Sequence, residues 1–194
     1  MGTRGLTMVV SNGETKVAQY GQWDHYPSGQ GITALKFLQD FDFNKFAKKL
    51  TLCKFIDEEK QKEIDAFLAE IGCPDSWMDM DQARQYKEKY QYLSRDHGAG
   101  ILYMIYNSED NEIWLHDQTN FAADSLFCEY AYVIDLDKKT FEIYSGFNHS
   151  DVDESERFAY LKDSVRDGDY GVIRHLKTYS LDDLPTEKQF LEDL

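Results

Sequence analysis

The start of the chain carries the residue types from which a nucleophilic site is built. Thr3 follows Met1-Gly2, and a threonine that begins a mature chain can attack as a nucleophile with its own α-amine as the base. Arg4 and Asp24 lie beside Thr3 at the end of a predicted hairpin, where they form either a structural ion pair or part of a site. We take Thr3, Arg4 and Asp24 as catalytic candidates, and of the two alternatives we expect the ion pair.

A loop rich in aromatic residues and glycine follows, with the sequence QYGQWDHYPSGQG. Backbone amides before a helix bind anions, and the Asp-His pair offers an acid and a base. The loop lacks the Lys-Ser/Thr of a phosphate-binding loop, and neighbouring residues of an extended chain point to opposite sides. A turn from strand to helix also explains most of its glycines. The candidate ligand-binding residues are Trp23, His25, Tyr26, Ser28, Gly29 and Gly31.

The histidines and cysteines do not follow a metal-ligand pattern. None of the five histidines lies two or four residues from another, and the three cysteines are widely spaced. The acidic stretches DVDESE and DGDYG lack the glycine or the later glutamate that a calcium loop requires. Widely spaced cysteines in an odd number indicate reduced thiols in a cytoplasm. We expect no metal and no cofactor.

Negative charge is concentrated in the second half of the chain. The net charge is −15, and residues 96–194 hold 22 Asp and Glu against 8 Lys and Arg. Direct nucleic-acid binding is disfavoured, because phosphate contacts need a basic face. Such a half is either a solvated surface or a binding face for a basic partner protein. The candidate partner-binding residues are Asp151, Asp153, Glu154, Glu156, Asp167 and Asp169.

The first elements to follow from the pattern are a hairpin and a helix. Two β-like runs joined by Ser-Asn-Gly-Glu predict a hairpin over residues 4–22, because Asn-Gly tolerates the positive φ of a tight turn. Apolar spacing then predicts a helix whose buried stripe starts at Ile32, with Ser28 in the place of its cap.

Further helical patterns follow up to residue 95. The same apolar spacing extends a second helix to Cys53, and Asp57 opens a third helix that stops at Gly72. With a fourth helix after it, residues 30–95 form a predicted helical block.

From Gly98 the apolar period changes to two, which is typical of strands. A short helix with Pro185 in its first turn is expected to end the chain. Strands at both ends with helices grouped between them predict an α+β protein with a mainly antiparallel sheet, in a single domain of residues 1–194. The predicted later strands cover residues 99–108, 112–117, a long hairpin over 126–147, and 170–181.

The N-terminal residues carry no targeting pattern. Their apolar run is too short for a secretory signal or a membrane span, and Leu6 stands where myristoylation needs Ser or Thr. We expect a cytoplasmic protein that does not associate with membranes.

The chain carries two resemblances to known families, one over most of its length and one over the first 36 residues. The segment TRGLTMVVSNGETKVAQYGQWDHYPSGQG resembles a family of uncharacterised proteins of phages, prophages and bacterial genomes, and EYAYVIDLDKKTFEIY and YSLDDLPTEKQFL are similar to its later segments. That resemblance implies a host-bacterial cytoplasm and carries no catalytic residue over. Some relatives have Cys where this chain has Gly2. More loosely, Thr3 after a glycine, with Asp24 and Lys36 downstream, resembles the N-terminal hairpin of proteasome-type N-terminal nucleophile hydrolases.

Three functions follow from these patterns. The first is a non-enzymatic binding factor of phage or mobile-element type, an inhibitor of a host defence protein that acts through its acidic C-terminal half. The second is an amidohydrolase, active or degenerate, that uses Thr3. The third is a module that binds an anion or small ligand at the loop Trp23–Gly31. The sequence favours the first.

Overall fold

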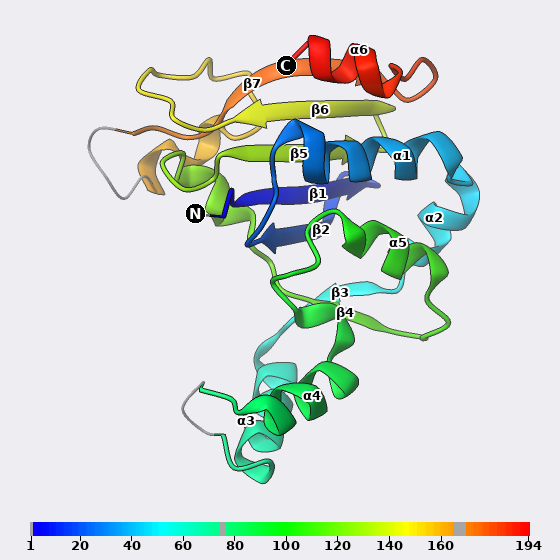
Figure 1. Ribbon diagram of the computed structural model, residues 1–194, viewed down its shortest axis with the longest axis vertical. Coiled ribbons are helices and arrows are strands. Elements are labelled where there is room, and N and C mark those ends of the chain that lie inside the picture. The colour runs from blue at the N-terminus through cyan, green and yellow to red at the C-terminus, as the bar shows by residue number, and fades with distance from the viewer. Residues whose placement is uncertain (1, 74–76, 165–169) are drawn as a thin grey trace.

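The body of the molecule is a five-stranded sheet with the strand order β2-β1-β5-β6-β7 (Figure 1). The structure is a computed structural model that describes residues 2–73, 77–164 and 170–194. Within this sheet β1 and β5 run parallel and the other three pairs are antiparallel, which confirms the α+β class with a mainly antiparallel sheet. The strands are β1 (Gly5–Ser11), β2 (Glu14–Gly21), β5 (Tyr130–Asp135), β6 (Thr140–Ser145) and β7 (Arg174–Ser180).

Tight turns shape the two hairpins of the sheet as local sequence predicts. Asn12 and Gly13 join β1 to β2 with φ values of 56° and 74°, the left-handed values expected from Asn-Gly. Lys139, with φ 54°, closes the turn between β5 and β6. Both predicted hairpins are therefore confirmed.

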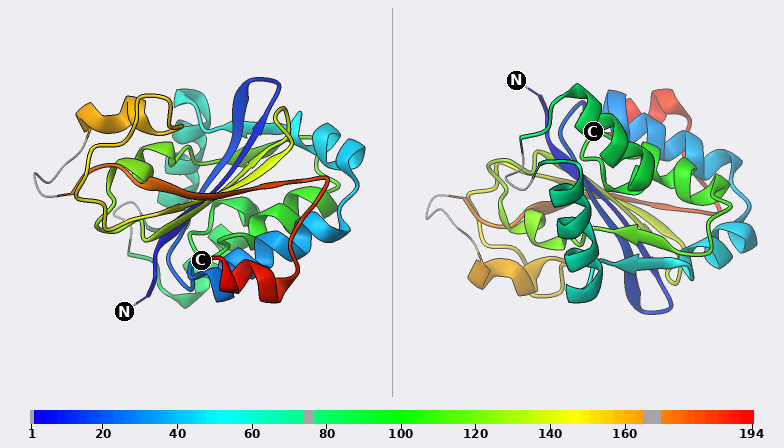
Figure 2. Two further views of the ribbon diagram at one scale, coloured as in Figure 1. Left: turned by 90° about the horizontal axis from the view of Figure 1, so that it is seen from above. Right: turned by 90° about the horizontal axis from the view of Figure 1, so that it is seen from below.

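The alternation along β5 divides the molecule into two cores. Tyr132 and Ile134 point into one core, whereas Ala131 and Val133 point into the other. Helices cover the first face of the sheet, which we call the helical face, and 3₁₀ turns cover the opposite face (Figure 2). The helices are α1 (Ile32–Asp40), α2 (Phe43–Leu50), α5 (Gly100–Asn107) and α6 (Glu187–Glu192), and the turns are η3 (Thr119–Ala123) and η4 (Ala159–Ser164).

The strand predicted at residues 99–108 is wrong, because this segment forms α5. Its buried side chains are Ile101, Leu102 and Ile105, a spacing that fits one side of a helix. A short, nearly continuous apolar run fits a buried strand and a buried helix equally well, so packing against α1 and α2 decides between them.

Three helix boundaries also differ from prediction. The second helix ends at Leu50, and Cys53 belongs instead to β3 (Cys53–Phe55), which pairs in parallel with β4 (Ile113–Leu115). Ser28 caps no helix, since Pro27–Gly31 forms the π-helical turn η1 without a side-chain cap. Pro185 precedes α6, whose capping residue is Thr186.

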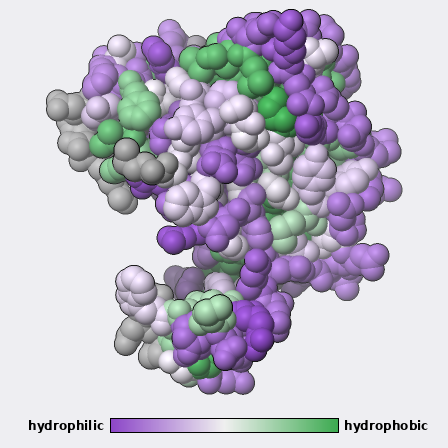
Figure 3. Space-filling view, in the orientation of Figure 1, coloured by the Kyte–Doolittle hydropathy of each residue, from purple (hydrophilic) through white to green (hydrophobic). Residues whose placement is uncertain are grey.

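The middle of the predicted helical block leaves the body as an arm, which we define as residues 57–90. It consists of α3 (Glu58–Glu70), capped by Asp57 as predicted, and α4 (Met80–Lys89). The arm projects from the body beneath β3 and β4, and the space-filling view shows a waist between the two (Figures 1 and 3). Its small core contains Ile64 and Tyr90 and is closed by Leu93 of the turn η2 (Gln91–Leu93).

Among the described residues, no helix has both the length and the apolar character needed to cross a membrane.

Candidate functional site

The structure separates the three catalytic candidates. Thr3 is 2% exposed, its hydroxyl has no hydrogen-bond partner, and its carbonyl accepts a bond from the His25 amide at 3.1 Å. The expected ion pair between Arg4 and Asp24 is wrong. The Arg4 guanidinium lies 4.2 Å from the centre of the Phe127 ring, and Asp24 is exposed in a left-handed turn with φ 56°. Stacking on an aromatic face is a favourable alternative for arginine.

The support that an N-terminal nucleophile needs is not gathered around Thr3. Lys36 lies on α1 and forms an ion pair with Glu187 of α6 at 3.1 Å. No described carboxylate or amine bonds to the Thr3 hydroxyl. The geometry therefore makes Thr3 a buried residue whose carbonyl holds the loop at His25 in place.

His25 is a packing residue of the helical face. Its ring is fully buried and lies against the backbone of Gly5 and Gly21, where any larger residue would collide with it. The Tyr132 hydroxyl donates to the His25 carbonyl at 2.7 Å, and burial lowers the pKa of His25 to about 4. His25 is therefore neutral at pH 7 and does not face solvent.

Three backbone amides that directly precede α1 are already bonded and are not free to hold an anion. The Gly29 and Gly31 amides donate to the Tyr26 carbonyl at 2.9 and 3.3 Å, and the Gln30 amide donates to the Asp24 carbonyl at 2.8 Å. Ser28 is exposed beside them, and Gly31 packs against the Tyr132 and Phe190 rings. The loop acts as a closed corner that leads the chain into α1.

What the loop does offer is aromatic surface. Trp23 and Tyr26 are 52% and 50% exposed, and Phe127 and Phe147 are 41% and 55% exposed. We call these four residues, together with Arg4, the aromatic end surface. Isolated exposed aromatics are ordinary, but a group of them at one place marks an interaction site.

Backbone contacts bring the members of the aromatic end surface together at one end of the sheet. The Glu129 amide donates to the Arg4 carbonyl at 3.0 Å, and the Gly146 amide donates to the Glu129 carbonyl at 2.9 Å. The ring centres of Tyr26 and Tyr130 are 6.4 Å apart. In Figure 1 the starts of β1 and β5 and the end of β6 meet at this end, next to the marked N-terminus.

The acidic candidates divide into exposed and structural residues. Asp151, Asp153 and Glu154 are exposed, although Glu154 also pairs with Lys162 at 3.5 Å. Glu156 is partly buried and accepts a bond from the His175 amide at 2.9 Å. Asp167 and Asp169 lie outside the described residues.

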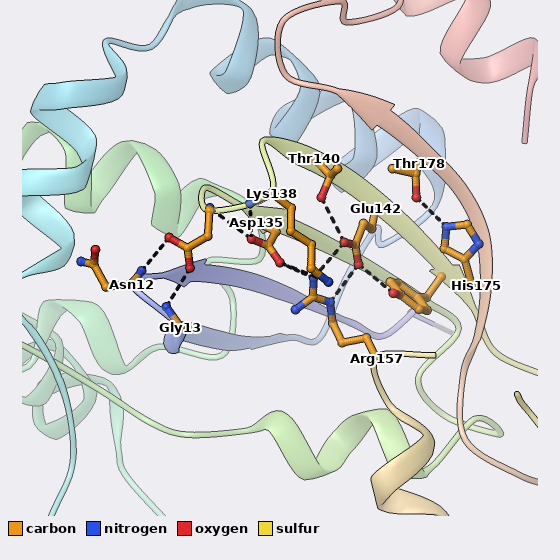
Figure 4. A network of polar contacts seen from close by, with 11 residues as sticks. Asn12, Gly13, Asp135, Lys138, Thr140, Glu142, Arg157, His175 and Thr178 are labelled. Atoms are coloured by element: carbon orange, nitrogen blue, oxygen red, sulfur yellow. Dashed lines mark hydrogen bonds and ion pairs between the residues drawn. The ribbon is translucent and has the colours of Figure 1, made fainter. Parts of the chain in front are cut away.

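A second polar cluster lies at the opposite end of the sheet, under the turn between β5 and β6 (Figure 4). Arg157 donates to Asp135 at 2.5 Å and to both oxygens of Glu142 at 2.8 Å. The Tyr144 hydroxyl donates to Glu142 at 2.7 Å. All these groups are largely buried, so the cluster holds the segment before η4 against the sheet and does not open to a ligand.

The positive charge of Arg157 compensates the buried carboxylates of this cluster. Burial by itself would raise the pKa of Glu142, but the hydrogen bonds and charge of Arg157, with the bonds from Tyr144 and Thr140, lower it to about 2. Asp137 in the same turn accepts bonds from the Asn12 and Gly13 amides at 2.8 and 2.7 Å. Asp137 therefore links the two hairpin turns.

Sequence reasoning missed Phe127, Phe147 and Arg157. No local pattern distinguishes them, because their roles arise from contacts with segments far away in the chain. Among the described residues, no group of three His, Cys, Asp or Glu side chains is placed to hold a metal ion. Comparisons of the chain with protein-family models, with curated proteins and with solved structures find no match.

Proposed function

We propose that the protein is a binding factor that docks on a basic partner protein through the aromatic end surface. The observation that carries the proposal is the exposure of Trp23, Tyr26, Phe127 and Phe147, from three separate segments, at the end of the sheet where Arg4 stacks on Phe127. Aromatic residues and arginine dominate the energetic centres of protein interfaces. Large aromatics exposed together in this way gain most from burial against a partner.

The charge distribution favours a basic partner. Asp24 lies within the same loop as Trp23 and Tyr26, and the exposed Asp151 and Asp153 follow the segment that carries Phe147. Complementary charge accelerates association and excludes other acidic proteins. The acidic half predicted from sequence thus contributes steering, whereas the aromatic side chains contribute affinity.

The class of partner follows from the resemblance to phage and prophage proteins. A protein encoded by a mobile element acts in a bacterial host, and a strongly acidic protein can occupy a basic surface that otherwise binds nucleic acid. We therefore propose a host protein with a basic binding face, such as a defence protein, as the target that is inhibited.

The test uses a partner captured from a bacterial lysate, identified, and purified for measurement of Kd. We expect Trp23→Ala and Phe147→Ala each to weaken binding about 30-fold, which corresponds to roughly 2 kcal/mol. We expect the affinity to fall as ionic strength rises. Leu176→Ala, at a half-exposed residue of β7, is the matched control and should leave the Kd unchanged. Equal loss in all three variants, or no loss in any, would refute the proposal.

A further inference from the structure

We propose that a cavity beside the end of β2 binds a nucleoside monophosphate. The cavity has a volume of about 590 Å³ and lies on the side of β2 opposite to the helical face, between Tyr20, the segment after η2 and the turn η3. This volume falls within the range of small-molecule pockets. The cavity shares no residue with the aromatic end surface, so it is a site in addition to the proposed protein interface.

Arg95 supplies a cation that the fold leaves uncompensated. Its side chain lines the cavity, is exposed, and has no ion pair or hydrogen bond with any described residue. Its position is fixed by the backbone, since its carbonyl accepts a bond from the Gln22 amide at 3.1 Å. A free guanidinium matches a phosphate group with two parallel hydrogen bonds. In a chain of net charge −15, such a group is a specific anchor for an anion.

Two aromatic rings form the apolar wall of the cavity. The centres of the Tyr20 and Phe121 rings are 4.9 Å apart at an interplanar angle of 77°, so each ring holds the other in place. The Tyr20 hydroxyl is also fixed, because it donates to the Gln22 side chain at 2.6 Å. Aromatic rings bind nucleobases by stacking, and rings that the fold already holds in place lose little conformational entropy when a ligand binds.

Amide and carboxylate groups of the cavity match the remaining parts of a nucleotide. The Gln118 side-chain oxygen accepts a bond from the Tyr20 amide at 2.9 Å, which leaves its NH₂ group to donate to a ligand. Asn120 lines the cavity with a second amide, and amides read the hydrogen-bonding edges of bases. Asp124 adds a carboxylate, an acceptor for ribose hydroxyls or a base amino group.

This combination selects a phosphorylated aromatic ligand over a bare anion. A bare phosphate can use only Arg95, and the negative charge of Asp124 in the lining of the same cavity opposes its binding. A ligand that places its base on the aromatic wall and its phosphate on Arg95 uses both parts of the site.

The test is a titration of the full chain, labelled with ¹⁵N, with each of the four common nucleoside monophosphates, with adenosine, and with inorganic phosphate. We expect at least one monophosphate to saturate the protein below about 1 mM and to shift the amide signals of residues 118–124. Adenosine and inorganic phosphate should each bind at least about tenfold more weakly than that monophosphate. Failure of all four monophosphates to saturate, or phosphate binding as tightly as the nucleotide, would overturn the proposal.

Two variants assign the binding to this cavity. Arg95→Ala should weaken the monophosphate about 10- to 100-fold, the range for a lost hydrogen-bonded charge. Arg174→Ala, which removes another exposed arginine, should change nothing. Arg95 is exposed, so the variant is expected to fold, and an unchanged melting temperature checks this. Equal binding by wild type and Arg95→Ala would exclude the cavity. The Arg95→Ala variant should still bind the protein partner, so a loss of nucleotide binding can be told apart from a failure of the proposed docking function.

Discussion

At the residue scale, His25 shows how a residue type associated with catalysis becomes part of a core. Its ring fills the space above two facing glycines, Gly5 of β1 and Gly21 of β2. The imidazole Nε2 has no hydrogen-bond partner, so a proton there would place an uncompensated charge in the core. Because of this packing, we expect the folded state to lose stability in acid.

We predict that the free energy of unfolding decreases as the pH falls from 6.5 to 4. In the unfolded chain His25 binds a proton with a pKa near 6.5, whereas burial lowers its pKa to about 4 in the folded chain. The unfolded state therefore binds more protons in this window. The contribution of neutral His25 to the free energy of unfolding is fully present above pH 6.5 and is lost as the pH falls toward 4. The full difference is roughly 3 kcal/mol.

Urea unfolding at several pH values checks this prediction. His25→Phe keeps a ring in the same place and should flatten the dependence between pH 6.5 and 4, whatever its effect on stability at pH 7. His97→Gln, at a more accessible histidine, is the control and should keep the wild-type slope. The same slope in His25→Phe as in the wild type would contradict the assignment.

At the scale of elements, Arg157 fastens the acidic segment and η4 to the sheet. Its guanidinium joins Asp135 at the end of β5 to Glu142 in β6, with 16% of its side chain exposed. Phe158, the next residue, packs its ring against Tyr144 at 4.9 Å. The ion cluster therefore holds η4 against the opposite face of the sheet together with the packing of Phe158.

We predict that Arg157→Met lowers the free energy of unfolding by about 3–5 kcal/mol. The substitution leaves two buried carboxylates without their cation, and this is more costly than the loss of an exposed pair. Lys139→Met is the control, because the pair of Lys139 with Asp182 at 3.3 Å is exposed and should contribute less than about 1 kcal/mol. Denaturant unfolding measures the free energy of unfolding of both variants. Similar decreases in the two would show that the buried cluster does not hold η4 against the sheet.

At the scale of the whole molecule, the arm and the body have separate cores. Neither of the two cores that flank the sheet contains a residue from the described part of the arm, residues 57–73 and 77–90. The core of the arm is small, and Trp77 and Met80 at or near the start of α4 are 94% and 90% exposed. The arm is therefore an addition to a body that is already complete.

We predict that replacing residues 57–90 with a short Gly-Ser linker leaves the body folded. The ends of the deletion lie close together, since the Ile56 amide donates to the Leu115 carbonyl at 2.9 Å and β4 contacts η2. Thermal unfolding should show a melting temperature within a few degrees of the wild type. Loss of the cooperative transition would show that the arm is required for the fold.

Much of the sheet could be predicted from sequence because its signals are local. Asn12-Gly13 specifies a turn through its own backbone preference, and Asp57 specifies a helix start through a bond to the amide three residues later. The apolar period of two likewise predicted the hairpin over 126–147, which contains β5 and β6. The candidate site was predicted only in part: the loop with Trp23 and Tyr26 was identified, but its ligand-binding geometry was not.

The two hairpins and the helix start at Asp57 follow from the sequence alone, since each depends on residues close together in the chain, and the acidic charge follows from composition. Packing between distant segments makes residues 100–107 a helix and places Arg4 on Phe127 instead of beside Asp24. The bond between Tyr132 and His25 spans 107 residues, and such contacts depend on how whole elements pack. Local preference carries no information about that packing, so the aromatic end surface and the cavity at Arg95 emerged only with the fold.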